Sequence, residues 1–369
     1  MYPQHLLEGV VQVQKDTDLQ TFKTVHKNDY VISLRSFQGG FEMSDYEGVC
    51  SPAYQVFYNT YVICHHYYKL LFKSQGFISM INSLVVGIRE GKNIQYGAFS
   101  YSDLPVPPLD EQTKIALQLE KKCGEIDALI SLQEEMISEL QAYKQSVITE
   151  AVTKGLNPHA KMKDSGVEWI GEIPEGWAVC STKHLFNLYS GATPKTDNDS
   201  FWDGNIPWIT PADFKTEDVY ISKGRRNITQ NGVDSCGTTI VPANSVIFSK
   251  RAPIGLVVLN KEPLCTNQGC ISCVPKETFS KYYYAMSVFT DSYELYGAGT
   301  TFMEISATSF ANFKLPNPSF EEQQSIATYL DEKTSQIDSL IALKQEKIQE
   351  LKDYKKSIIY EYVTGKKKV

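Results

Sequence analysis

A repeat decides the fold of this chain: residues 104–153 read LPVPPLDEQTKIALQLEKKCGEIDALISLQEEMISELQAYKQSVITEAVT, and residues 315–364 read LPNPSFEEQQSIATYLDEKTSQIDSLIALKQEKIQELKDYKKSIIYEYVT. The two stretches align without a gap at a constant offset of 211 residues, and about half of their positions are identical. Self-similarity at a fixed offset indicates two copies of one structural unit.

Each copy predicts one long helix. Prolines stand where they suit a helix start, and acidic residues follow in the first turn, where the helix dipole favours them. Apolar residues then recur at alternating spacings of four and three, the period of a coiled coil. A helix of ~44 residues is roughly 66 Å long, too long to pack alone. We therefore expect helices over 109–154 and 319–369 that pair as an antiparallel coiled coil; the alternative is that each packs on its own globular neighbour.

The expected coiled-coil interface consists of the apolar seam positions of both helices. They are Leu119, Ile126, Ile130, Ile137 and Leu140 in the first copy, and Leu330, Ile337, Ile341, Ile348 and Leu351 in the second. Polar residues interrupt both seams at matching places, Gln133 with Lys344 and Lys144 with Lys355. Polar seam residues usually fix the register at a cost in stability; the alternative is a stretch that is frayed or faces a partner.

Two segments of mixed character precede the helices, residues 1–108 and 155–318. Short β-branched runs bounded by Pro and Asn predict strands in both. NDYVISLR at 28–35 aligns with NSVIFSKR at 244–251, whereas the long opening of the second segment has no counterpart in the first. The expected fold class is α+β, with two mixed α/β domains alternating with the two long helices.

Charge neither proves nor excludes a nucleic-acid partner. The formal net charge is −7, and nine acidic residues against five lysines at 110–154 account for more than half of it, whereas a simple DNA-binding domain is usually basic. No apolar run approaches the ~20 residues that span a membrane, and the N-terminus lacks a signal-peptide pattern. The eight cysteines are then typical of reduced thiols, and we expect a cytoplasmic protein without a membrane partner.

Candidate DNA contacts are polar side chains on expected loops. They are Arg35, Thr193, Lys195, Lys250, Arg251, Thr300 and Thr301. An arginine at the end of a strand suits a contact to guanine or to a phosphate, with a plain surface charge as the alternative. The threonines and Lys195 stand on glycine-containing loops, which suit DNA contacts or are plain turns. Trp202 and Trp208 are expected in the core rather than against bases, because large aromatic residues dominate core energetics.

The residues that could suggest catalysis or metal binding do not form a complete motif. Cys265, Cys270 and Cys273 have a spacing found in iron–sulfur proteins, but a strand would point the last two to opposite faces. The pair His65-His66 lacks any zinc-ligand spacing, and Glu120 has no carboxylate cluster around it for a nuclease metal. The sequence therefore predicts a protein that is not an enzyme, with no metal and no cofactor of its own.

With these features the chain resembles the specificity subunits of type I restriction–modification systems. The diagnostic strings are GVEWIGEIPEGW at 166–177, GATP at 191–194, IPWIT at 206–210, and LPNP at 315–318 before EQQ at 322–324. The resemblance implies two target-recognition domains that each read one half of a bipartite site in double-stranded DNA. It also implies that the helices hold the halves apart and dock modification (methyltransferase) subunits in two copies. Restriction (translocase and nuclease) subunits would complete the complex, and S-adenosylmethionine would belong to the methyltransferase.

The first domain departs from the family pattern because it lacks counterparts of Trp177, GATP and IPWIT. A second hypothesis follows: a coiled-coil scaffold or recombinable partial subunit that no longer reads one half-site, with self-association through its helices. A stand-alone enzyme is the third hypothesis and has no motif in its favour.

Overall fold

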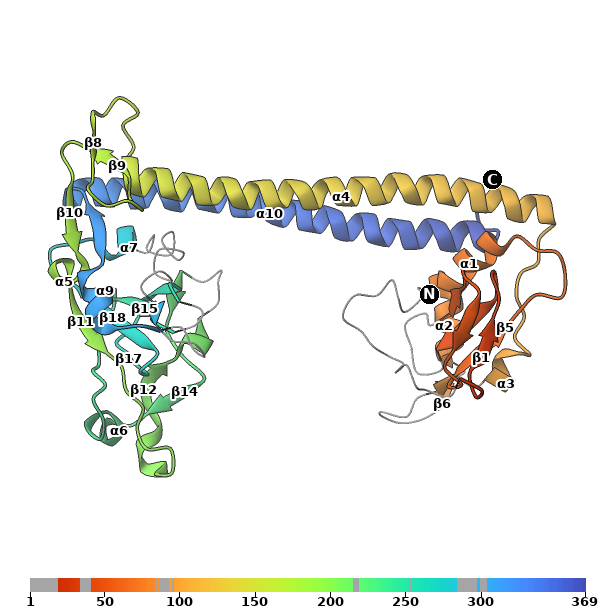
Figure 1. Cartoon of the computed structure of the whole chain (residues 1–369), viewed down its shortest axis with the longest axis horizontal. Coiled ribbons are helices and arrows are strands. Elements are labelled where there is room, and N and C mark those ends of the chain that lie inside the picture. Colours follow the sequence, from red (N-terminus) through yellow and green to blue (C-terminus); the bar gives the residue numbers. More distant parts are fainter. Residues whose placement is uncertain are drawn as a thin grey trace. The chain divides into compact units, whose positions relative to one another are not determined.

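Figure 1 shows the chain as a computed structural model. The structure describes residues 19–33, 41–83, 85–86, 93–94, 96–214, 219–251, 254–283, 297–298 and 304–369. The chain divides into two compact units: unit 1 comprises Met1–Ile137 with Ala342–Val369, and unit 2 comprises Ser138–Ile341. Both units mix helices with strands, so the fold belongs to the expected α+β class.

Each of the two long helices begins in one unit and ends in the other. Helix α4 spans Leu109–Lys154 and helix α10 spans Phe320–Val363. Gly155 follows α4 with a φ of +73°, a left-handed conformation that glycine adopts without steric cost and that ends helices. Helix α10 ends earlier than the expected residue 369, because Gly365 takes the same conformation with a φ of +71°.

All ten apolar seam positions are buried or half-buried, as a 3.5-residue repeat requires. In unit 1, Leu119, Ile126 and Ile130 of α4 share a core with Ile348 and Ile358 of α10. Lys355 Nζ donates to the Asp127 carboxylate at 2.6 Å, and Lys344 donates to Gln133 Oε1 at 3.3 Å. From the first of these contacts to the second, the residue number increases on α4 and decreases on α10. The two helices are therefore antiparallel in this unit.

Unit 2 repeats one of these contacts at the 211-residue offset. Lys144 Nζ donates to Asp338 Oδ1 at 2.7 Å, and the offset counterparts of these two residues are Lys355 and Asp127. Lys144 and Lys355 therefore each reach an aspartate of the other helix, which agrees with a register-fixing role. Half-exposed ion pairs contribute only about 0–1 kcal/mol each, so they act on register more than on stability.

Unit 1 packs antiparallel strands against short helices. Strand β2 (Tyr30–Ser33) lies between β3 (Phe41–Met43) and β5 (Tyr54–Phe57). The remaining elements are β1 (Lys23–Val25), β4 (Gly48–Cys50), α1 (His65–Lys73), α2 (Gln75–Ser83), β6 (Val85–Val86), β7 (Asn93–Ile94) and α3 (Tyr96–Phe99). Aromatic rings in mutual contact fill the core: Tyr30, Phe41, Phe57, Phe72, Phe77 and Phe99.

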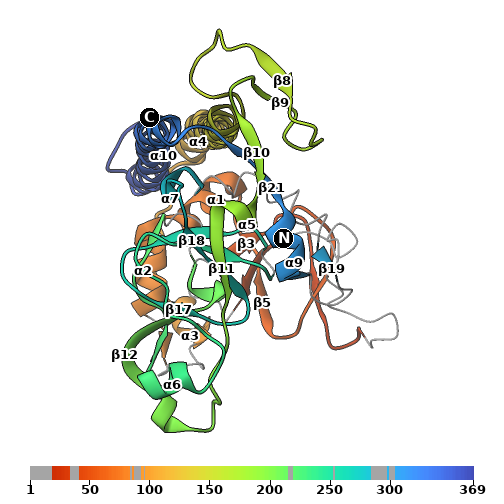
Figure 2. The same cartoon turned by 90° about the vertical axis from the view of Figure 1, so that its left-hand side faces the viewer.

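Unit 2 is built on a five-stranded sheet of order β11-β18-β15-β16-β13 and a three-stranded sheet of order β14-β12-β17. Their strands are β11 (Phe186–Ser190), β12 (Trp202–Ile209), β13 (Tyr220–Ile221), β14 (Arg226–Ile228), β15 (Val246–Ser249), β16 (Val257–Asn260), β17 (Cys265–Thr266) and β18 (Cys270–Pro275). The other pairs are β8 (Met162–Asp164) with β9 (Glu172–Pro174), β10 (Ala178–Ser181) with β21 (Lys314–Asn317), and β19 (Gly297–Ala298) with β20 (Glu304–Ile305); Figure 2 shows β10 beside β21. The short helices are α5 (Thr182–Leu185), η2 (Asp199–Phe201), η3 (Pro211–Asp213), α6 (Gln230–Asp234), α7 (Ser280–Tyr283) and α9 (Ala307–Asn312).

The sheets of the two units share one register at a constant offset of 216 residues. Tyr30 pairs with Met43 and Phe57 in unit 1, and Val246 pairs with Leu259 and Cys273 in unit 2. The residues before the central strands, Asn28 and Asn244, both have a positive φ, of 73° and 64°. The alignment of the two patterns is therefore structurally correct over the described residues 28–33.

A buried glutamine ties each globular segment to the start of its long helix. Gln112 and Gln323 are related by the 211-residue offset and are 2% and 1% exposed. In each, Oε1 accepts a hydrogen bond from a backbone N–H of the globular segment, and Nε2 donates to a carbonyl five residues upstream. The N–H groups are those of Cys64 and Phe279, and the carbonyls are those of Pro107 and Pro318.

Among the described residues, no helix combines the length and the apolar character that crossing a bilayer requires.

Candidate nucleic-acid interface

The Gly-Ala-Thr-Pro-Lys loop after β11 carries two candidate side chains, Thr193 and Lys195. Two buried indoles brace it: Trp208 Nε1 donates to Ala192 O at 3.0 Å, and Trp202 Nε1 donates to Lys195 O at 3.1 Å. The tryptophans are 8% and 4% exposed and meet edge to face at 5.2 Å, so the expectation of core residues is confirmed. They act on the loop through their N–H groups.

Gly191 starts this loop because no side chain fits there. A Cβ at this position would lie 2.2 Å from Asn267 O and 2.3 Å from Thr266 O. The close approach allows Ala192 N to donate to Thr266 O at 3.0 Å. The loop is thus held against the end of β17 as well as against the two indoles.

An Asn-Gln-Gly turn before β18 joins three of the candidate segments. The Thr193 hydroxyl donates to the side chain of Gln268, which is exposed. Lys250 N donates to Gly269 O at 2.9 Å. A Cβ on Gly269 would lie 2.9 Å from the Pro211 ring, so this glycine lets the turn after β12 approach.

Lys250 and Arg251 share one carboxylate at the end of β15. Lys250 Nζ lies 2.8 Å from Glu304 Oε1, and Arg251 Nε donates to Glu304 Oε2 at 2.9 Å. The Lys250 side chain is only 13% exposed, against 43% for Arg251. The expectation that both stand on an exposed loop is therefore wrong for Lys250, because its backbone also bridges Gly269 O and Ile305 N and draws the residue inward. Arg251 keeps part of its guanidinium accessible.

The pKa of Glu304 is lowered. Burial alone would raise it, but hydrogen bonds and charge attraction from Lys250 and Arg251 outweigh that effect. The carboxylate is consequently ionised at neutral pH and orients both cations.

A basic turn before β14 was not among the sequence candidates. It reads Lys-Gly-Arg-Arg at 223–226 and is the densest group of cations in residues 155–318, which is the signal that could have found it. The Arg226 guanidinium lies 3.7 Å above the Trp202 ring, and Arg225 N donates to Asp213 Oδ1 at 3.1 Å. These contacts attach the turn to the same sheet that braces the Gly-Ala-Thr-Pro-Lys loop.

We call the resulting surface the loop interface; it comprises segments 191–195, 210–213, 222–226, 250–251 and 267–269. These segments hold six cations and a single carboxylate, although the whole chain is acidic. Positive charge on neighbouring loops attracts the phosphates of nucleic acid and raises its local concentration.

Three sequence candidates, Arg35, Thr300 and Thr301, lie outside the described residues. Of the remaining four, Thr193, Lys195, Lys250 and Arg251 all belong to the loop interface. Gln268, Lys223, Arg225 and Arg226 join them.

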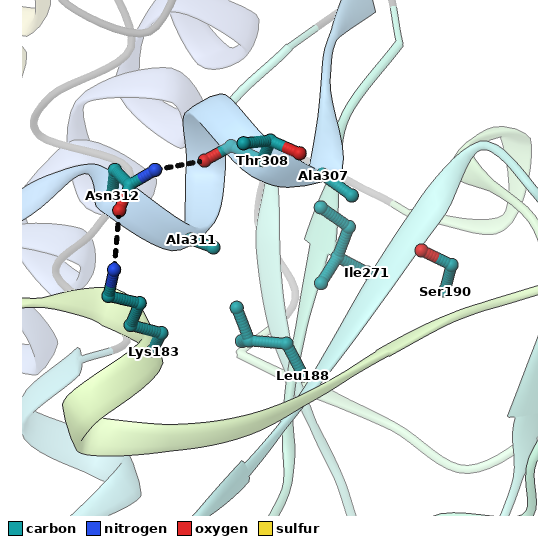
Figure 3. A pocket seen from close by; sticks show the side chains of 8 residues that line it. All are labelled: Lys183, Leu188, Ser190, Ile271, Ala307, Thr308, Ala311 and Asn312. Atoms are coloured by element: carbon teal, nitrogen blue, oxygen red, sulfur yellow. Dashed lines mark hydrogen bonds between the residues drawn. The ribbon is translucent and has the colours of Figure 1, made fainter.

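A pocket of about 340 Å³ is lined by residues that include Ser190, which directly precedes the loop interface in the sequence (Figure 3). Leu188 and Ile271 come from the sheet, and α9 supplies Ala307 and Ala311 opposite them. At the rim, Lys183 Nζ donates to Asn312 Oδ1 at 2.8 Å and Asn312 Nδ2 donates to Thr308 O at 3.0 Å. Because this lysine is already bonded and the floor is apolar, the pocket is a feature of packing between α9 and the sheet.

The cysteines do not form a metal site among the described residues, where no group of three His, Cys, Asp or Glu side chains gathers. Cys270 packs in one apolar cluster and Cys273 in another, on opposite faces of β18 as a strand requires. Burial raises the pKa of the Cys265 thiol to about 12, which keeps it protonated.

Residues 174–353, which contain the whole loop interface, match the family described as type I restriction modification DNA specificity domain. The chain is 41% identical over 181 residues to the type I restriction enzyme MjaIX specificity subunit of Methanocaldococcus jannaschii, an alignment that covers 48% of this chain and 41% of that protein. This chain carries the type I specificity domain at residues 174–353. It is also 28% identical to the EcoR124I/EcoR124II specificity subunit of Escherichia coli, over 68% of this chain and 61% of that one.

Solved structures share the fold of this chain. A chain from a study of assembly and conformational transition in a type I restriction–modification system superposes with a TM-score of 0.73 at 20% identity, covering 92% of this chain and 83% of that one. The HsdS subunit from Thermoanaerobacter tengcongensis superposes with a TM-score of 0.56 at 18% identity, covering 93% and 82%. The alignments span 41% to 63% of the length of four curated relatives that the chain matches.

Proposed function

We propose that the chain is the non-catalytic DNA-recognition subunit of a type I restriction–modification complex, and that unit 2 reads one half of a bipartite target through the loop interface. The observation that carries this proposal is the gathering of six cations and Gln268 on braced loops within the specificity domain. Arginine and glutamine are the side chains that pair bidentately with guanine and adenine. Bracing keeps them in place before DNA arrives, which lowers the entropic cost of binding.

The antiparallel contacts between α4 and α10 support a ruler that separates two half-sites. The contact between Lys144 and Asp338 and its counterpart between Lys355 and Asp127 favour a single register. In this proposal one register on two helices sets the spacing of the half-sites, and unit 1, whose three-stranded core repeats the one in unit 2, reads the second half-site.

Exposed apolar residues on the long helices support the docking of two copies of a methyltransferase partner. They occur in pairs at the 211-residue offset: Leu129 with Leu340, Leu132 with Leu343, and Tyr143 with Tyr354. Exposed apolar groups that recur in this way mark protein contacts. Catalysis and S-adenosylmethionine belong to that partner in this proposal, and restriction subunits bind the same complex.

The proposal is tested by selection of DNA from a pool of randomised duplexes with the whole chain. We expect enrichment of one motif, and we expect Arg251→Ala to cost about 1–3 kcal/mol at one position of it. Lys314→Ala, which removes an exposed cation outside the loop interface, is the matched control and should leave the motif intact. Weakening that is uniform across sequences would assign Arg251 to a phosphate, and absence of any enriched motif would refute the proposed function.

A further inference from the structure

We propose that Arg225 reads a guanine in the target DNA and that Asp213 is the positioning residue that aims it. The proposal rests on the proposed function and deepens it, because it assigns one base contact to one side chain.

The turn that carries Arg225 is packed tightly against the three-stranded sheet. Gly224 precedes it, and a Cβ on that glycine would lie 2.6 Å from Trp208 O. Arg225 N donates to Asp213 Oδ1 at 3.1 Å. The backbone of Arg225 is thus fixed on both sides, although its side chain is 75% exposed.

The carboxylate of Asp213 is itself immobilised. Its side chain is only 5% exposed, and Oδ2 accepts hydrogen bonds from Thr210 N at 2.8 Å and from Thr210 Oγ1 at 2.7 Å. A buried carboxylate is costly unless it is hydrogen-bonded and paired with a cation. Arg225 supplies the cation, with Nε 3.6 Å from Asp213 Oδ1.

The guanidinium of Arg225 is held along one edge. Nη2 donates to Ala212 O at 2.9 Å, and Nε faces Asp213. The Nη1 group and the second N–H of Nη2 make no hydrogen bond with the described residues. These adjacent donors are the pair that meets O6 and N7 of guanine in the major groove.

A base contact explains this support better than a phosphate contact does. A phosphate can also be bound by a point charge without a set orientation, which the exposed Lys223 on the same turn provides. A bidentate contact to a base requires a planar fork in a set orientation, which lysine lacks. Pro211 also places the Asp213 turn against Gly269, next to Gln268, so that two side chains able to read bases stand on neighbouring turns.

The test uses the whole chain and a pool of randomised duplexes, with Arg225→Ala, Arg225→Lys and Asp213→Asn. We expect the unmodified chain to enrich a motif that contains a guanine, and Arg225→Ala to lower the preference for that guanine about ten- to a hundredfold. Arg225→Lys should lose the same preference while keeping the salt dependence of affinity, since the charge remains. Asp213→Asn should weaken the preference at the same position and at no other, which loss of stability alone would not produce.

The matched control is Lys223→Ala, which removes one positive charge from the same turn. We expect it to lower affinity evenly for all sequences and to reduce the salt slope by about one. If Arg225→Ala behaves like Lys223→Ala, Arg225 binds a phosphate and the inference is wrong, whereas the proposed function stands. If the unmodified chain enriches no motif, the proposed function itself is refuted, and the inference that rests on it is refuted with it. A motif that all three Arg225 and Asp213 variants retain would also overturn the inference.

Discussion

Gly191→Ala is expected to abolish sequence-selective reading of the half-site assigned to unit 2 and to lower the free energy of unfolding of that unit by about 3 kcal/mol. The added methyl would lie 2.2 Å from Asn267 O, closer than real Cβ contacts allow, and the opposing atoms are backbone. The loop must therefore move away from β17. It then loses the hydrogen bond from Ala192 N to Thr266 O and the indole bond to Ala192 O.

Two measurements check this expectation: chemical denaturation, and selection from randomised duplexes. Gly176→Ala is the matched control in the same unit, because its Cβ would meet nothing within 4 Å. We expect the control to retain both stability and motif. If Gly191→Ala keeps the motif and the unfolding midpoint, the loop does not present Thr193 and Lys195 to DNA as described.

Gln323→Leu is expected to lower the free energy of unfolding by about 3 kcal/mol, because several buried polar groups would lose a partner worth about 1–3 kcal/mol each. The side chain accepts from Phe279 N at 2.8 Å and from Thr278 Oγ1 at 2.9 Å, and it donates to Pro318 O at 3.0 Å. Leucine has a similar volume, so the loss is one of hydrogen bonding and not of packing.

Amide hydrogen exchange locates the damage. Gln323→Leu should expose Phe279 N–H to exchange and leave Cys64 N–H protected, whereas Gln112→Leu should do the reverse. Gln324→Leu, at the neighbouring exposed position, should change stability by less than about 0.5 kcal/mol. Equal exchange at Phe279 in the Gln323 and Gln324 variants would show that the buried glutamine does not hold the globular segment to its helix.

The sequence predicted the parts of the fold that depend on periodicity. Alternating spacings placed the seam of both helices, and Leu119 and Ile348 are buried where the 3.5-residue repeat puts them. Two aligned patterns predicted a strand in each segment, and Tyr30 and Val246 lie on strands that pair with equivalent neighbours. Periodicity is a local property, so a single sequence displays it.

The loop interface could be predicted only in part, because its geometry comes from contacts between distant segments. Lys250 was expected to be exposed, but Glu304, more than fifty residues away in the sequence, pairs with it. The support of Arg225 by Asp213 depends on two turns that the sheet brings together. No spacing rule relates such residues. The only sequence signal for the turn is its three cations within four residues, and the sequence candidates did not include it.

The methylome of cells that carry this chain with a methyltransferase partner tests the central claim most directly. The account expects one bipartite methylated motif that disappears when the chain is deleted and whose bases in one half become degenerate when Gly191→Ala is introduced. A methylation pattern that is the same with and without the chain would contradict the claim that it reads DNA sequence.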